Sequence, residues 1–331
     1  MKLTPAQVAQ FYDQGYLIVE NVLSESEIEP IREEYNAILD REAPRLVAKG
    51  QLSQTYDHLP FEERYTAMLN EIDDMYALYQ YLDISLPLQA QIPADTEMNA
   101  GPAVFHNILR NKNILDIAES LLGPELYSNP VQHARIKPPK SALPQTIDLD
   151  SNVARTFWHQ DEAVLTDDAL DINMVTVWVA MTDATVKNGC LICVPRSHRE
   201  DATMHCPANG SSAAEIFIPD ELIDADAVTP MPVKKGGVVL LHQRTQHAAL
   251  DNNSEQIRWS FDLRYNVTGQ ATGRDVFPGF VARSAAEPES ELIDADEWAN
   301  MWYRTRDELA TVDEVAFNER WVPFGRHVLC A

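Results

Sequence analysis

The stretch Gly236-Gly-Val-Val-Leu-Leu-His-Gln-Arg-Thr-Gln-His247 decides the fold class. An apolar run follows a glycine pair and ends in a polar turn, which is typical of a short buried strand. Turn signals such as Lys187-Asn-Gly189 and Asp251-Asn-Asn253 separate several further runs of this kind. The predicted strands are Val131–Ile136, Asn173–Thr182, Cys190–Pro195, Val238–His242 and Ile257–Asn266.

Helical spacing is largely absent from this region, so a parallel sheet with crossover helices is not expected. Antiparallel strands at such intervals favour a sandwich or a jelly-roll barrel. We therefore predict a mainly β fold in which a jelly-roll, cupin-like core is decorated by helices at both ends. The mostly helical N-terminal part spans 1–130, the core spans 131–267 and a helical extension spans 268–331. Because no linker separates these parts, we expect a single catalytic domain over 1–331.

Capping signals locate the helices around this core. Thr4-Pro5 starts a helix that runs to Gly15, and Tyr16–Val22 follows as a strand. The capping box Ser24-Glu-Ser-Glu27 opens a long helix, which should end near Arg41, before Pro44. Further helical patterns lie near 62–82, 111–122 and 288–308.

Composition and charge restrict the class of function. The 331 residues are 45% apolar and 23% charged, which is ordinary for a globular protein. The 26 basic residues against 51 acidic ones give a net charge of −25. Such a surface repels nucleic acid and anionic membranes, so we expect neither as a partner. The four cysteines are too few and too clustered for a disulfide framework, and no signal peptide or membrane span is apparent. A reducing, cytoplasmic location is expected.

Two motifs carry residues that could bind a metal. In Thr156-Phe-Trp-His-Gln-Asp161, an imidazole and a carboxylate lie two residues apart, although a surface pair is an alternative interpretation. His247 follows an apolar strand and adds a second imidazole. Two histidines and one carboxylate leave three metal positions open, as in non-haem Fe(II) oxygenases. His242 competes with His247, but its place inside the strand favours a hydrogen-bonded core histidine.

Arg258 lies 11 residues beyond His247, inside a predicted strand. A guanidinium binds a carboxylate through two parallel hydrogen bonds, so a carboxylate cosubstrate would suit it inside a barrel. An outward-facing arginine on an edge strand is the alternative.

Together these motifs resemble the phytanoyl-CoA dioxygenase family of Fe(II)/2-oxoglutarate-dependent oxygenases, over roughly residues 5 to 270. The matching stretches are Phe11–Val19, Ile136–Pro139, Trp158–Asp161, Val177–Met181, Lys187–Leu191, Val194–His198 and the run from His247 through Asn252 to Arg258. The resemblance implies a double-stranded β-helix fold. One departure is Ala249, where the family often has a small hydroxyl residue.

Carried over residue by residue, the resemblance implies roles for six side chains. His159, Asp161 and His247 would ligate Fe(II). Arg258 would bind the far carboxylate of 2-oxoglutarate, with help from Lys137, and Trp178 would line the cosubstrate pocket. O₂ would be the second cosubstrate.

Strand alternation adds a prediction about the substrate. If Lys137 points into the barrel, Arg135 and His133 do so too, and Arg264 shares a face with Arg258. This lining suits a small polar or anionic substrate, unless these residues form a structural ion-pair cluster.

The sequence thus predicts a dioxygenase that hydroxylates an unactivated C–H bond of a small polar metabolite and releases succinate and CO₂. Desaturation, cyclisation or demethylation at the same iron are alternatives. A non-catalytic jelly-roll binding module and a cupin-like isomerase with another divalent metal are alternatives from other classes.

Overall fold

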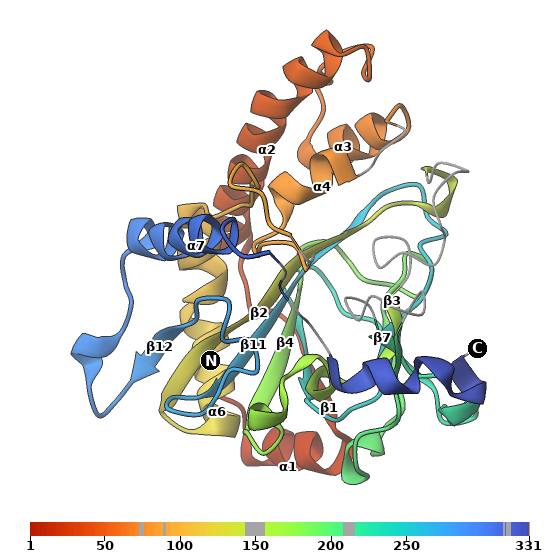
Figure 1. The fold of residues 1–331 in the computed structure, drawn as a ribbon, viewed down its shortest axis with the longest axis vertical. Helices are drawn as coiled ribbons and strands as arrows, with labels where there is room; N and C mark the ends of the chain where they lie inside the picture. The colour runs from red at the N-terminus through yellow and green to blue at the C-terminus, as the bar shows by residue number, and fades with distance from the viewer. Residues whose placement is uncertain are drawn as a thin grey trace.

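The computed structural model describes residues 1–72, 76–88, 91–142, 156–207, 216–313, 315 and 319–330. Its centre consists of two antiparallel sheets (Figure 1). The larger sheet has six strands in the order β1-β9-β4-β11-β2-β12, with bounds Tyr16–Val19, Val238–His242, Met174–Ala180, Arg258–Val267, Glu125–Lys137 and Phe280–Ser284. The smaller sheet has the order β3-β10-β5-β8, with bounds Thr156–His159, His247–Ala249, Leu191–Cys193 and Thr229–Met231. β6 (Cys206–Pro207) pairs with β7 (Ile216–Phe217).

The two sheets pack on one another through buried side chains that both contribute. Trp178, Val239 and Leu241 from the larger sheet meet Leu191 and Met231 from the smaller one. This arrangement confirms the mainly β, jelly-roll core. β2 begins six residues earlier than predicted, because the strand continues through Pro130 at an irregularity in its register with β11.

β11 has two faces with different chemistry. Trp259, Phe261, Leu263 and Tyr265 belong to the large apolar core outside the sheet, where Trp259 contacts the ring of Tyr35 at 4.7 Å between centroids. The alternate residues Arg258, Ser260, Asp262 and Arg264 face the other way, because successive side chains on a strand point to opposite sides. The ten residues of β11 thus contribute both to the apolar core and to the polar interior.

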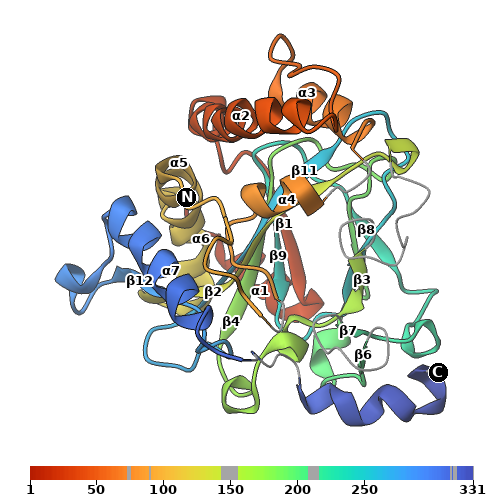
Figure 2. The same cartoon turned by 45° about the horizontal axis from the view of Figure 1, so that its top comes forward.

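Helices cover the outer face of the larger sheet. In two views, α6 and α7 lie on the side of β2 and β4 that faces away from β3 (Figures 1 and 2). The helices are α1 Pro5–Gln14, α2 Glu25–Ala48, α3 Phe61–Leu69, α4 Tyr76–Leu82, α5 Pro102–Val104, α6 Lys112–Leu122 and α7 Ala295–Leu309. In the described part of the chain, no helix combines the length and apolarity needed to cross a bilayer.

Two helix predictions were wrong in their boundaries. α2 does not end before Pro44 but continues to Ala48. A proline removes one backbone hydrogen bond, and the burial of Leu39 and Leu46 on either side of it holds the helix together. The C-terminal helix starts at Ala295 behind the cap Asp294, and Pro288–Ser290 forms only a short 3-10 turn.

Candidate active site

Three predicted metal ligands meet where β3 and β10 lie side by side. His159 ends β3, and His247, which begins β10, pairs with it in register. Asp161 opens the 3-10 helix η3 (Asp161–Val164) directly after β3. One ligand atom from each residue lies within 4.8 Å of the others, and the two imidazole rings are 4.2 Å apart. This is the geometry of a two-histidine, one-carboxylate metal site.

Hydrogen bonds to the backbone prepare both imidazoles to bind a metal. Nδ1 of His159 donates to the Phe157 carbonyl at 2.8 Å, and Nδ1 of His247 donates to the Thr245 carbonyl at 2.9 Å. In each ring the other nitrogen, Nε2, therefore carries the lone pair. Burial and the neighbouring His247 lower the pKa of His159 to about 4, so this ring is neutral at pH 7.

Asp161 is completely buried and is held on both of its oxygens. Arg264 binds Oδ1 through Nη2, and the Thr176 hydroxyl donates to Oδ2. Burial alone would raise the pKa of Asp161, but the positive charge of Arg264 outweighs it and keeps this pKa well below its usual value. The ligand is therefore a carboxylate in a fixed orientation.

The positively charged side chain of Arg258 is buried in the same interior. Its Nη1 donates to the Ser260 hydroxyl at 2.8 Å, and its guanidinium lies 5.1 Å from the centre of the Trp178 ring. Its buried Nε has no hydrogen-bond partner among the described residues. Burial and the charge of Arg135 lower the pKa of Arg258 to about 10, still well above neutral pH. A buried donor of this kind fits an anion that binds here.

Lys137 lies directly opposite Arg258, in register on the neighbouring strand β2. Its ammonium group donates to the Leu250 carbonyl at 2.7 Å. Its predicted part in binding the cosubstrate stays a prediction, as does that of Trp178.

A cavity of about 100 Å³ opens onto the metal ligands. The three predicted substrate residues, His133, Arg135 and Arg264, all line it. They differ in what they already contact. His133 donates from Nδ1 to Asp83 at 2.9 Å, whereas Arg264 is bound to the metal ligand Asp161. Arg264 thus has a protein partner that the sequence did not reveal.

His242 lies elsewhere. Its ring is 5.0 Å from that of His198 and 6.4 Å from that of Phe11, and its Nδ1 accepts a hydrogen bond from the Arg244 backbone. It is not part of the metal-binding group.

The C-terminal end of the chain braces the turn that carries Asp161, a feature the sequence did not suggest. Arg320 donates to the Glu162 carbonyl at 2.7 Å, and the Trp321 indole donates to the Ala163 carbonyl at 2.8 Å. The Trp321 ring also lies 4.8 Å from that of His205, whose Nε2 accepts from the Gln160 backbone. These contacts fix the backbone between and beyond the first two metal ligands.

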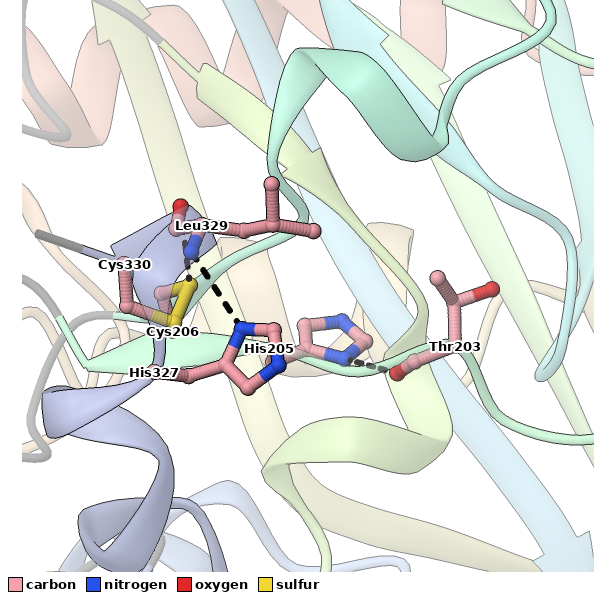
Figure 3. Close-up of a disulfide and its surroundings, with 6 residues drawn as sticks. All are labelled: Thr203, His205, Cys206, His327, Leu329 and Cys330. Atoms are coloured by element: carbon pink, nitrogen blue, oxygen red, sulfur yellow. Dashed lines mark hydrogen bonds between the residues drawn. A yellow bond between two sulfur atoms is a disulfide. The ribbon is translucent and has the colours of Figure 1, made fainter.

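A disulfide ties this C-terminal segment to β6. Cys206 and Cys330 are bonded although 124 residues separate them (Figure 3). The neighbouring His205 donates from Nδ1 to the Thr203 carbonyl at 2.7 Å. The sequence led us to expect no disulfide framework, and the structure has this single disulfide. The other two cysteines, Cys190 and Cys193, are free and buried.

The family model for phytanoyl-CoA dioxygenase (PhyH) matches residues 11–260, which is most of the chain. The chain belongs to this family. The phytanoyl-CoA dioxygenase domain-containing protein 1 of Danio rerio is 26% identical over 270 residues, covering 77% of this chain and 87% of that protein. The phytanoyl-CoA dioxygenase of Arabidopsis thaliana is 22% identical over 268 residues, with coverages of 79% and 88%.

Solved structures share the fold. EvdO2 from Micromonospora carbonacea var. aurantiaca, complexed with 2-oxoglutarate, has a TM-score of 0.53 at 20% identity and covers 82% of this chain and 94% of its own. EctD from S. alaskensis, with 2-oxoglutarate and 5-hydroxyectoine, has a TM-score of 0.51 at 18% identity, with coverages of 81% and 77%.

Membership of the phytanoyl-CoA dioxygenase family, together with the triad of His159, Asp161 and His247, makes this protein a non-haem Fe(II)/2-oxoglutarate-dependent oxygenase. The binding-module and isomerase alternatives are thereby set aside.

Proposed function

We propose that the enzyme hydroxylates an unactivated C–H bond of a small polar metabolite and releases succinate and CO₂. The observation that carries this proposal is the unpartnered, buried Nε of Arg258, which lines the same cavity as the metal ligands His159 and His247. Iron with 2-oxoglutarate and O₂ would supply the oxidant for the C–H bond.

Different side chains would bind the iron and the cosubstrate. His159, Asp161 and His247 would hold the iron, and Arg264 would keep the carboxylate of Asp161 ionised and oriented. Arg258 would bind the far carboxylate of 2-oxoglutarate through its guanidinium fork.

Two further side chains would complete the cosubstrate site. The Trp178 ring, against which the Arg258 guanidinium lies, would limit where that guanidinium can point. Lys137 would add positive charge from the opposite strand. Trp178 lines the cavity, which supports its assignment.

The lining of the cavity supports a polar substrate. His133 and Arg135 face it, and Asp262 lies opposite His133 in register. EctD, which shares the fold, was solved with the small polar molecule 5-hydroxyectoine. A long acyl chain would remove water from the charged groups of Arg135 and Asp262 without replacing its hydrogen bonds.

The test is an anaerobic titration with Fe(II) and 2-oxoglutarate, followed by the weak visible charge-transfer band of the complex. We expect the band in the wild type, its loss in His159→Ala, and a need for far more 2-oxoglutarate in Arg258→Gln. Arg110→Gln removes a guanidinium that pairs with Glu291 outside the cavity and serves as the matched control. No band in the wild type, with metal shown to be bound, would overturn the proposal. A substrate screen scored by succinate release, with product analysis, then separates hydroxylation from desaturation, cyclisation and demethylation.

We also propose that the enzyme works in the cytoplasm, as its sequence suggested. In that reducing compartment Cys206 and Cys330 would be kept largely as thiols, although the two side chains are placed to form a disulfide. Alkylating the thiols in intact cells, followed by a non-reducing gel, tests this: a bond formed in nearly all copies would contradict a cytoplasmic location.

A further inference from the structure

The cavity beside the metal ligands carries a surplus of positive charge. Among its described lining residues are four arginines and a single carboxylate: Arg135, Arg258, Arg264, Arg274 and Asp262. The protein as a whole has a net charge of −25. A cationic interior inside an acidic protein is costly unless anions compensate it.

Two of the four arginines are accounted for within the protein. Arg264 binds the carboxylates of Asp161 and Asp262 and donates to the Val131 carbonyl at 2.9 Å. Arg274 donates to the Val164 carbonyl at 2.9 Å, at the end of the turn that carries Asp161. Both hold the metal-binding turn in place.

The other two arginines, Arg135 and Arg258, line the same cavity. Under the proposed function, Arg258 binds one carboxylate of 2-oxoglutarate. Of the four arginines, Arg135 is then the one whose role is still unassigned. It lies on β2 opposite Ser260, two residues from Lys137 and from His133 on the same strand face.

The neighbours of Arg135 stabilise its charge without forming an ion pair with it. Burial lowers the pKa of Arg135, but the nearby Tyr79 hydroxyl and the carboxylates of Asp262 and Asp83 outweigh burial and raise this pKa. The nearby carboxylate of Asp83 is already used, because Oδ2 accepts from His133 at 2.9 Å and Oδ1 accepts from the Ala134 backbone at 2.8 Å. In the part of the chain that the structure describes, no carboxylate lies within 4.0 Å of the Arg135 nitrogens.

We propose that Arg135 is a specificity-determining residue that binds an oxyanion of the substrate, a carboxylate or a phosphate. The inference rests on the proposed function, because it assumes that 2-oxoglutarate occupies Arg258. The anion would be held on β2, and the C–H bond to be oxidised would point toward His159 and His247 on the opposite sheet. A guanidinium fork recognises both oxyanions.

The test measures anion binding to protein already saturated with Mn(II) and 2-oxoglutarate, without O₂. Acetate and inorganic phosphate are titrated separately by calorimetry, which distinguishes the two kinds of oxyanion. At least one should bind the wild type, and Arg135→Gln should weaken that binding at least tenfold. Arg135→Lys should restore much of it, and Arg110→Gln should leave it unchanged. The affinity for 2-oxoglutarate should be equal in all four proteins.

Several results would overturn the inference. If 2-oxoglutarate binds but neither anion does, or if the anion binds Arg135→Gln as well as the wild type, the anion site is refuted while the proposed function stands. If Arg135→Gln loses affinity for 2-oxoglutarate instead, Arg135 serves the cosubstrate and the inference is wrong. If the wild type fails to bind 2-oxoglutarate, the proposed function falls and the inference falls with it. Should Arg135→Gln not fold, Arg135→Met provides the same comparison, because it also removes the positive charge and keeps much of the side-chain volume.

Discussion

Removing the guanidinium of Arg264 should destabilise the metal-free protein by about 3 to 5 kcal/mol. In Arg264→Met the side chain keeps much of its volume, but Asp161 stays buried with only the hydrogen bond from Thr176. Deleting one partner of a buried ion pair is costly because the remaining charge loses its compensation. The whole stability of a domain is about 5 to 15 kcal/mol, so urea unfolding followed by circular dichroism, in the presence of a chelator, would resolve the change.

A double variant separates charge compensation from packing. Asp161→Asn combined with Arg264→Met removes the unpaired charge together with its partner. The double variant should therefore recover at least half of the free energy of unfolding that Arg264→Met loses. If Arg264→Met alone does not fold, recovery of folding in the double variant carries the same information. A loss below about 1 kcal/mol in Arg264→Met, or a double variant no more stable than the single one, would refute the reasoning.

Three further measurements test other parts of the molecule. Cys206→Ser, or reduction of the disulfide, should lower the free energy of unfolding by about 2 to 5 kcal/mol, because the bond spans 124 residues; equal urea midpoints with and without dithiothreitol would contradict this. The contribution of neutral His205 to the free energy of unfolding should be complete above about pH 6.5 and decrease as the pH falls toward 3. Burial lowers the pKa of His205 to about 3 in the folded protein, so between these pH values the unfolded chain binds the proton and the folded protein does not. His205→Gln should show a shallower pH dependence, and an unchanged slope would count against this cause. Gly189→Ala should weaken 2-oxoglutarate binding roughly tenfold, since residue 189 has φ +88° and a Cβ there would lie 2.5 Å from the Leu250 carbonyl that holds Lys137; an unchanged titration midpoint would show that this contact is irrelevant.

Local patterns supplied the candidate metal ligands, and the family resemblance assigned them. His159 and Asp161 are separated by one residue at a strand end, and His247 follows an apolar run, so each signal lies within a few residues of sequence. Alternation along β11 likewise placed Arg258 and Arg264 on one face. It could not show that Arg264 reaches Asp161, because Asp161 follows β3, a strand of the other sheet.

The parts that were missed depend on distant packing. The disulfide joins residues 124 positions apart, and the same C-terminal segment docks Arg320 and Trp321 on the turn after Asp161. The end of α2 was misjudged for a related reason, since buried contacts of Leu46 outweigh the local effect of Pro44. Neither outcome leaves a periodic or capping signal in the sequence.

The two faces of β11 constrain how this enzyme can change during evolution. A single inserted or deleted residue near the start of the strand would turn Trp259 and Phe261 inward and Arg258 outward, so the apolar core and the proposed cosubstrate residue would be displaced together. New substrate preferences therefore have to arise by point substitution on the inner face, with the reading frame of the strand intact. Attempts to redirect the enzyme in the laboratory should vary positions 133 and 135 on β2 and position 262 on β11, and leave the lengths of both strands unaltered.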